Sequence, residues 1–266
     1  GTRGNTSYLR GTADLAYAIA VTEAPKKAVA SITFAGSKAE VDAVFARVQK
    51  SDLKHSQWIA SFDEPGRGAG FYVSGPEGEP YRFVVEQEKT AALPAERTRP
   101  LQLSHVALNS GNREAATRMM VDVFGFRLSD RTRIMNFVRC DNTHHCIAYA
   151  DNENFSLNHI AFEMIDTDAV MRGMGRLKDA NCPTAWGPGR HGPGNNTFSY
   201  FVAPYGACIE YTAEVQRVND DYPVGKPEDW KWPPGRADQW GITAPHTPRW
   251  KRIQEMIPFT PGAWRL

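Results

Sequence analysis

Paired cysteines and long apolar runs are both missing from this sequence. Its 266 residues include four cysteines, none in a Cys-x-x-Cys pair, which argues against a zinc knuckle or a disulfide framework. No apolar run approaches the roughly 20 residues that a membrane span needs. We therefore expect no membrane partner, and a reducing cytoplasm is the simplest home for such cysteines.

An excess of charge is also missing. Lysine plus arginine number 31 against 30 aspartates plus glutamates, and no basic face with interleaved aromatic residues stands out. Nucleic acid is therefore not an expected partner. Residues 1–4 do not resemble a secretory leader. With 41% hydrophobic residues the chain can bury one or two ordinary cores.

What the sequence does contain is a repeated order of predicted elements. The first copy comprises a strand at 103–109, a helix at 112–124 and strands at 127–133, 136–140 and 145–150. The second comprises a strand at 158–164, a helix at 167–180 and three strands that end at 212, although the glycine-rich stretch from Trp186 to His191 itself reads as a turn. Each copy is a βαβββ unit, and this internal repeat decides the predicted architecture.

A related pattern precedes them. Predicted strands at 6–11 and 15–23 are followed by a strand at 28–34, a helix at 37–50 and strands at 71–73 and 81–85. Residues 71–78 superpose on 199–206, tyrosine on tyrosine and turn on turn. In that register Arg82 replaces Glu210 and Ser31 replaces His159, so this copy has lost the side chains that could bind a metal.

Three residues of metal-ligand type fall at equivalent ends of the two later copies. His105 in the first copy matches His159 in the second, and Glu210 is matched by Ala148. If the copies close around one cavity, the two imidazoles and the carboxylate converge and a fourth ligand is missing. A carboxylate inside a strand needs such a partner, because burying an unpaired charge is costly.

Two histidines and one carboxylate leave about three positions free on a six-coordinate ion, as in non-haem ferrous oxygenases. Side chains alternate along a strand, so His105 shares its face with Ala107, and His159 with Ala161. These small neighbours leave room for an ion. A lone strand histidine is usually a core or surface group, but three residues of metal-ligand type at equivalent positions of the repeat are harder to dismiss.

One stretch is especially specific: Gly189-Arg190-His191 followed by Tyr200, Pro204, Gly206 and Glu210. With it, residues 101–213 resemble the catalytic domain of type I extradiol ring-cleavage dioxygenases, in the vicinal oxygen chelate superfamily of paired βαβββ modules. Ser199 departs from that signature, which usually has an aliphatic or aromatic residue there.

The resemblance implies an α+β fold in which paired modules form two incomplete barrels. Residues 1–92 would be a metal-free N-terminal domain that lacks its first strand and helix in this numbering. Residues 93–100 would be a linker, 101–213 the catalytic domain, and 214–266 a tail rich in tryptophan and proline that packs on it. A flap over the cavity or a subunit contact is the alternative for the tail.

The resemblance also implies site roles. His105, His159 and Glu210 match the iron ligands, for Fe(II) or alternatively Mn(II). His145 matches the histidine over the oxygen site. His191 and Tyr200 match the residues that contact the substrate's hydroxyl oxygens. The expected partners are a small aromatic diol and O2, and the expected assembly is a homo-oligomer.

Three further residues are weaker candidates for substrate contact. Asn195 and Asn196 lie where the family often contacts substrate, although a turn role is equally consistent with the glycines before them. His144 competes with His145, since a regular strand would turn His144 toward the site, whereas a bulge would turn His145 there. For His144 the plainer alternative is a surface histidine in a turn.

The resemblance predicts an Fe(II)-dependent extradiol dioxygenase that opens a catechol-type ring. One alternative is another enzyme of the superfamily, a glyoxalase-like isomerase or a thiol transferase. Those enzymes tend to use a fuller ligand set, so Ala148 argues against them. The other is a metal-free binding protein of bleomycin-resistance type, which has no need of two histidines and a glutamate in register.

Overall fold

The computed structural model describes residues 1–85 and 87–259, and it contains three sheets. The largest has nine strands, of which eight form a continuous order, β12-β13-β14-β11-β7-β10-β9-β8, while β15 pairs with β11. The two smaller sheets, β1-β2-β3 and β4-β6-β5, belong to the first 85 residues. Among the described residues, no helix is both long and apolar enough to span a bilayer.

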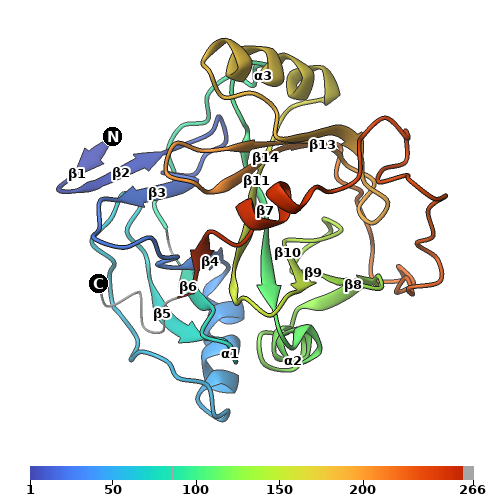
Figure 1. Cartoon of the computed structure of the whole chain (residues 1–266). Coiled ribbons are helices and arrows are strands. Elements are labelled where there is room, and N and C mark those ends of the chain that lie inside the picture. Colours follow the sequence, from blue (N-terminus) through green and yellow to red (C-terminus); the bar gives the residue numbers. More distant parts are fainter. Residues whose placement is uncertain (86, 260–266) are drawn as a thin grey trace.

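The large sheet consists of two βαβββ units that lie side by side, with β15 added at β11 (Figure 1). The first unit comprises β7 (Gln102–Ser110), α2 (Arg113–Arg118), β8 (Arg127–Arg131), β9 (Met135–Arg139) and β10 (Ile147–Asp151). The second comprises β11 (Ser156–Glu163), α3 (Thr167–Asp179), β12 (Trp186–Arg190), β13 (Thr197–Val202) and β14 (Cys208–Ala213). In each unit the first strand runs parallel to the last, and β7 and β11 join the units as an antiparallel pair. The predicted repeat and fold class are thereby confirmed.

The N-terminal region repeats part of this plan. It comprises β1 (Thr2–Arg3), β2 (Thr6–Leu9), β3 (Ile19–Thr22), β4 (Ile32–Ala35), α1 (Lys38–Val48), β5 (Ala69–Ser74) and β6 (Pro80–Val85). From β4 onward these elements follow the βαβββ order, with the strand after the helix reduced to isolated bridges from His55 and Ile59 to β5. A capping box of Ser37 and Glu40 fixes the start of α1.

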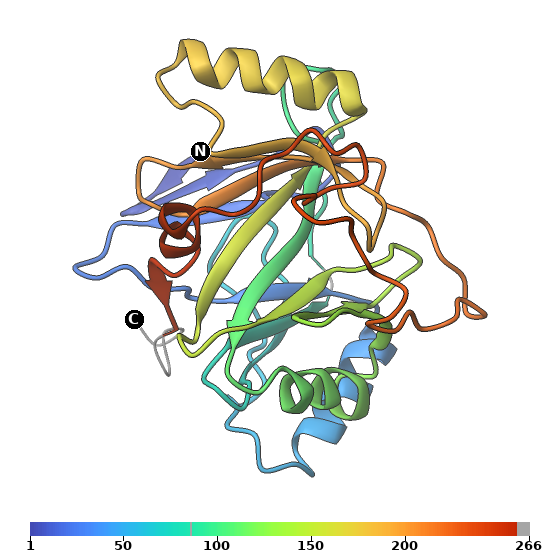
Figure 2. The same ribbon diagram turned by 45° about the vertical axis from the view of Figure 1, so that its right-hand side comes forward.

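One apolar core joins the two regions. Residues of α1, β5 and β6 belong to the same buried cluster as residues of β7, β10 and the segment after α2. Arg47 donates hydrogen bonds to the carbonyls of Val123 and Phe124. These bonds tie α1 to that segment, and Figure 2 shows the blue helix α1 beside the green helical segment. The hydroxyls of Tyr81 and Tyr149 lie 2.7 Å apart inside the core. The N-terminal region therefore packs against β7, β10 and the segment after α2 in the first βαβββ unit of the large sheet.

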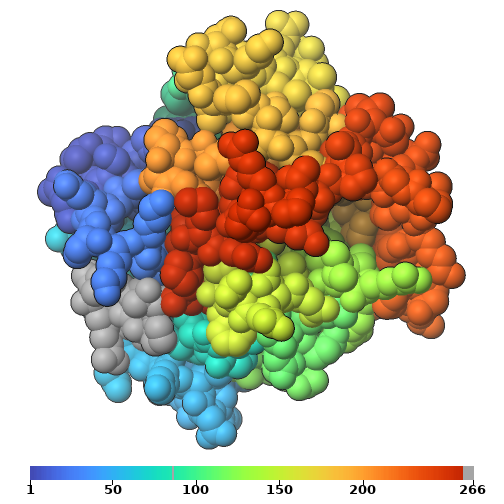
Figure 3. All heavy atoms as spheres, in the orientation of Figure 1, coloured from blue at the N-terminus to red at the C-terminus, as the bar shows by residue number. Residues whose placement is uncertain are grey.

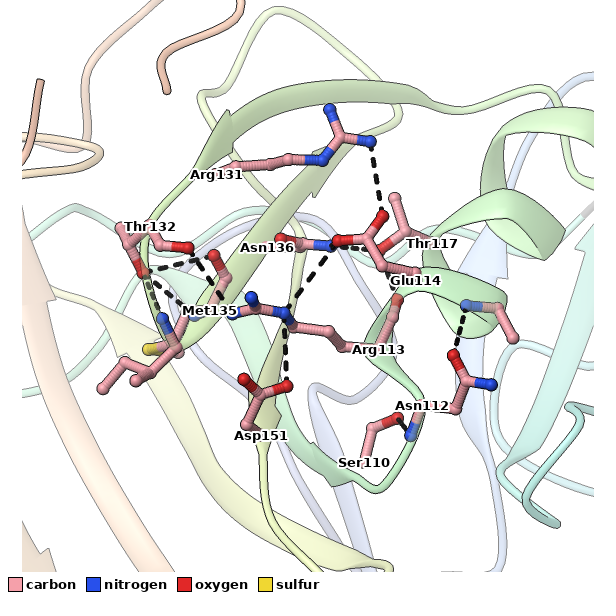
Figure 4. Close-up of polar contacts among 12 residues, drawn as sticks. Ser110, Asn112, Arg113, Glu114, Thr117, Arg131, Thr132, Met135, Asn136 and Asp151 are labelled. Atoms are coloured by element: carbon pink, nitrogen blue, oxygen red, sulfur yellow. Dashed lines mark hydrogen bonds and ion pairs between the residues drawn. The ribbon is translucent and has the colours of Figure 1, made fainter. Parts of the chain in front are cut away.

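Polar contacts hold α2 on its sheet (Figure 4). Arg113 lies 3.2 Å from the carboxylate of Asp151 on β10, and Asn136 on β9 donates to Glu114 and to Thr117. The helix is shorter than predicted, because at Met119–Val123 it becomes a π-helix (η1). The contacts fix the helix in place against β9 and β10, the strands that lead into and out of the His144–His145 loop.

Two local predictions were wrong. Trp186–Arg190 is the strand β12 and not a turn, which its proline permits because β12 lies at the sheet edge and pairs only with β13. No bulge occurs within β10, since the strand begins at Ile147 with a regular register. His144 and His145 precede it in an irregular loop, so strand alternation does not apply to them.

The C-terminal tail contains α4 (Pro248–Ile253) and β15 (Ile257–Pro258), and Figure 3 shows it spread over the surface of the later units. Trp250 is buried, and its ring lies 5.4 Å from that of Tyr200. Gln254 donates to the carboxamide oxygen of Asn158. Trp264, which was counted with this tail, lies outside the described residues. The predicted division into domains stays a prediction.

Candidate metal centre

Three side chains from three neighbouring strands meet inside the large sheet. Nε2 of His105 on β7 lies 3.3 Å from Nε2 of His159 on β11. Oε2 of Glu210 on β14 lies 3.2 Å from the first nitrogen and 3.1 Å from the second. All three residues are buried, and they form a group able to hold a metal ion.

Strand register explains why they converge. Ala161 pairs with His105 on one side and with Glu210 on the other, so His105, Ala161 and Glu210 form one row across the sheet. In the next row Ala107 lies between His159 and Ala148. Side chains paired in this way point to the same face. The alanines therefore supply space between the larger groups, as strand alternation predicted.

The residue before each histidine orients its ring. Nδ1 of His105 lies 3.2 Å from the hydroxyl of Ser104, and Nδ1 of His159 lies 2.8 Å from Oδ1 of Asn158. Asn158 donates its own amide to Asn109, so its oxygen is left to accept. Each Nδ1 thus has a polar partner, and each Nε2 is directed at the carboxylate. Sequence reasoning missed Ser104 and Asn158, although their equivalent positions in the repeat were a usable signal.

The donor set fits a divalent ion. Oε2 of Glu210 is buried and has no well-directed hydrogen-bond partner among the described residues, while two imidazole nitrogens lie close to it. Adjacent ligands of a six-coordinate ion with bonds of about 2.1 Å are separated by about 3 Å. The observed spacings of 3.1–3.3 Å match that arrangement.

Electrostatics keeps the carboxylate ionised. Burial alone would raise the pKa of Glu210, but the two imidazoles beside it, that of His105 first, outweigh burial and hold the pKa well below the ordinary value. For His159 burial has the larger effect and lowers its pKa despite the nearby glutamate. The site therefore presents one negative charge and a neutral imidazole from His159, which suits a cation.

His145 lies beside this group. Its ring centroid is 4.3 Å from that of His105, and burial lowers its pKa well below the ordinary value. A Cβ on Gly194 would come within 2.9 Å of the His145 ring, so the close packing of the ring requires glycine there. His144 is fully buried and points the other way, toward Asp130, so it is no surface residue. The predicted surface alternative for His144 was wrong.

His191 and Tyr200 lie on the other side of the carboxylate. Nε2 of His191 is 2.9 Å from the Tyr200 hydroxyl and 3.8 Å from Oε1 of Glu210. The His191 ring stacks on Phe198 at 3.9 Å between centroids, and burial lowers its pKa to about 4. Burial raises the pKa of Tyr200 well above its usual range. Both groups are thus neutral hydrogen-bonding partners near the ligand cluster.

The two asparagines have different surroundings. Asn196 is buried and donates to Oε1 of Glu210 and to the Thr212 hydroxyl. Asn195 is exposed, has a left-handed backbone (φ 48°) and accepts from Arg190 and Gln239. Asn196 therefore supports the carboxylate, while Asn195 has the geometry of a turn. A substrate contact for either residue stays a prediction.

Comparison with known proteins identifies the superfamily of this domain. The model of the Glyoxalase/Bleomycin resistance protein/Dioxygenase superfamily matches residues 102–211. Metapyrocatechase 2 of Cupriavidus necator is 31% identical over 159 residues, which cover 56% of this chain and 47% of that protein. An iron-dependent extradiol dioxygenase of Rhodococcus jostii is 27% identical over 135 residues, 45% of each chain. The chain thus spans about half the length of these curated relatives.

Among solved structures, the Mn(II)-bound glyoxalase of Novosphingobium aromaticivorans has a TM-score of 0.86 and 32% identity, covering 99% of this chain and 87% of that one. Homoprotocatechuate 2,3-dioxygenase of Arthrobacter globiformis has a TM-score of 0.81 at 24% identity, with 94% and 81% covered. This chain therefore belongs to the glyoxalase, bleomycin resistance protein and dioxygenase superfamily. Its fold is that of the extradiol dioxygenases.

Proposed function

We propose that this protein is an Fe(II)-dependent extradiol dioxygenase, which opens a catechol-type ring beside its hydroxyls with O2. The observation that carries the proposal is the cluster of His105, His159 and Glu210 with Ala148 at the position of a fourth ligand. Such a cluster leaves about three coordination positions for a diol and dioxygen. The similarity to metapyrocatechase 2 and to an iron-dependent extradiol dioxygenase supports the same activity.

Iron held by the three ligands would bring the diol and dioxygen together and pass electrons between them. The remaining roles belong to the side chains around it. The hydroxyl of Tyr200 and Nε2 of His191 are 2.9 Å apart, so together they can hydrogen-bond to the oxygens of a bound diol and stabilise charge there. The neutral ring of His145 can take a proton from the substrate and return it.

A second candidate is a metal-dependent isomerase with Mn(II). It is favoured by the Mn(II)-bound glyoxalase, which resembles this chain over nearly its whole length. Ala148 argues against it, because an isomerase of this superfamily tends to use a fuller ligand set. Ring cleavage is also favoured by three side chains near the cluster that can donate or accept hydrogen bonds, His145, His191 and Tyr200.

The test is made on protein purified without oxygen. Its metal content is measured first, and it is then loaded separately with Fe(II) and with Mn(II). Each form is assayed for O2 uptake and a yellow ring-fission product with a panel of single-ring and biaryl catechols, and for isomerisation of a glutathione hemithioacetal. We expect O2 uptake with the iron form. Isomerisation without O2 uptake would replace the dioxygenase with the second candidate.

The proposal extends to assembly and partners. The expected ligands are a small aromatic diol and O2, and the expected assembly is a homo-oligomer. Light scattering coupled to size-exclusion chromatography measures the assembly directly. A monomer at all concentrations would remove the oligomer from the proposal and leave the chemistry untouched.

A further inference from the structure

A chain of three buried side chains leads away from the metal cluster. Nδ1 of His145 lies 3.0 Å from Nδ1 of His144, and Nε2 of His144 lies 2.7 Å from Oδ2 of Asp130. The side chains of His144 and Asp130 are fully buried. This hydrogen-bonded chain of side chains begins beside the ring of His105 and ends at Asp130 on β8. It therefore connects the site to the second strand of the first unit.

The carboxylate at the far end is fixed by the C-terminal tail. The backbone N–H of Gly225 donates to Oδ1 of Asp130 at 2.9 Å, and the Tyr222 hydroxyl lies 3.4 Å from both carboxylate oxygens. A Cβ on Gly225 would come within 2.3 Å of Oδ1, so only glycine allows this approach. Oδ2 is thereby left to face His144.

For an ionised carboxylate and neutral rings, donor and acceptor chemistry sets every proton in this series of side chains. An ionised carboxylate only accepts, so Nε2 of His144 must carry the hydrogen that it shares with Asp130. A neutral imidazole has a single N–H, so Nδ1 of His144 is a lone pair and accepts. The hydrogen between the two rings therefore belongs to Nδ1 of His145, and Nε2 of His145 is bare.

We propose that Asp130 and His144 are positioning residues that hold His145 in its Nδ1–H tautomer. The tautomer keeps the bare Nε2 on the ring edge away from His144, free to accept a hydrogen bond or a proton from a ligand. The tautomer is a property of the protein alone, whereas its effect on turnover rests on the proposed dioxygenase function. Sequence reasoning did not single out Asp130, Tyr222 or Gly225.

The first experiment uses the metal-free wild-type protein labelled with [15N]histidine. Long-range 1H–15N correlations distinguish a protonated from a bare ring nitrogen, and single substitutions assign the signals of the seven histidines. At a pH where these rings are neutral, we expect Nε2–H for His144 and Nδ1–H for His145. Finding the hydrogen of His145 on Nε2 would overturn the proposal, whatever the variants do.

The second experiment uses Asp130→Asn. The N–H of Gly225 still needs an oxygen at the Oδ1 position, so the new amide group turns its NH2 toward His144. Nε2 of His144 must then accept, its hydrogen moves to Nδ1, and His145 is left with its hydrogen on Nε2. We expect both tautomers to switch in the metal-free protein. Unchanged tautomers in a folded variant would contradict the proposal.

The same variant, loaded with iron, is predicted to bind the metal normally and to lose turnover by a factor on the order of 10²–10⁴. A comparable change behind the catalytic histidine of serine proteases lowers turnover about 10⁴-fold through the wrong tautomer. Tyr222→Phe is the matched control, because it removes only two 3.4 Å contacts and leaves the carboxylate in place. It should keep both tautomers and most of the activity.

The two hypotheses fail in different ways. If the tautomers are as stated and switch in Asp130→Asn, but wild-type protein cleaves no catechol, then the dioxygenase assignment is wrong and the positioning chain stands. If wild-type protein cleaves catechols but Asp130→Asn turns over at the wild-type rate with switched tautomers, the tautomer has no role in the reaction. That last outcome would end the proposal as stated.

Discussion

The same position in two sheets carries opposite charges. On β14, Glu210 pairs with Tyr200 of the neighbouring antiparallel strand, and on β6, Arg82 pairs with Tyr72 in the same way. On its other side Arg82 pairs with Thr33 of a parallel strand, as Glu210 pairs with an alanine. The structure thus confirms the repeat register that was read from the sequence.

The two buried charges are balanced differently. Arg82 donates to Glu64 and to the hydroxyls of Thr33 and Tyr17, at 2.8–2.9 Å, so its charge is neutralised within the protein. Glu210 faces two imidazoles whose nitrogens point at one of its oxygens. The fold therefore tolerates a buried charge at this position, and the neighbouring side chains decide whether it becomes a structural ion pair or a metal ligand.

Removing the buried charge should abolish metal binding at Glu210 and should leave metal binding unchanged at Arg82. We expect Glu210→Ala to lose the metal, with affinity weakened more than the roughly 10- to 100-fold typical of changes around a ligand. Arg82→Ala should retain full metal content. Metal analysis after anaerobic loading and desalting measures both. A Glu210→Ala protein with one ion per chain would show that the ligands had been misassigned.

Replacing a neighbour of the cluster should separate binding from chemistry. His145→Ala is expected to keep its metal, because His105, His159 and Glu210 remain, and to lose about 10²- to 10⁴-fold in kcat, the usual contribution of a positioned acid or base. Metal content and steady-state O2 uptake are compared on one preparation. Loss of the metal from His145→Ala would mean that His145 is itself a ligand.

The sequence predicted the ligands because their arrangement is local and repeated. His105 and His159 occupy the same place in two copies of one unit, and period-two alternation gives their face. The group around His145 could not be found in this way. His144 lies in an irregular loop, where alternation has no meaning, and its partner Asp130 is 14 residues away. Such contacts depend on how strands and loops pack, which no local pattern encodes.

The partners of the N-terminal site escaped prediction for the same reason. Arg82 was recognised as the counterpart of Glu210, but Glu64 and Tyr17 reach it from segments outside the regular strands. Similarly, the tail was expected to pack on its own domain, while the contact of Gly225 with the Asp130 carboxylate had no signal in composition. Sequence periodicity identifies residues within helices and strands. Their contact partners in loops can be identified only from a three-dimensional structure.

Breaking the ion pair should cost stability without touching the metal. Arg82→Ala leaves Glu64 buried and unpaired, and removing one partner of such a pair costs about 3–5 kcal/mol. Replacing both residues in Arg82→Met with Glu64→Gln should recover most of that loss. Urea unfolding of the two variants gives the comparison. Equal destabilisation of the single and double variants would show that packing, and not the charge pair, is what stabilises this region.

A third buried carboxyl extends the comparison to a group beside which the described residues place no cation. Glu79, in the turn between β5 and β6, is fully buried, and one of its oxygens has no hydrogen-bond partner among the described residues. Burial raises its pKa to about 7, whereas the two imidazoles hold the pKa of Glu210 low. A raised carboxyl pKa favours the protonated form in the folded state, so stability is lost as pH rises from about 4.5 through 7.

Glu79→Gln removes that loss, since glutamine stays neutral and its oxygen can still accept from the backbone N–H of Glu77. We expect the variant to match wild type near pH 4.5 and to exceed it by about 3 kcal/mol above pH 8. Urea unfolding across that range measures the difference. A gap that stays constant with pH would mean that Glu79 is ionised in the folded protein, and that the N-terminal region neutralises it by a contact of its own.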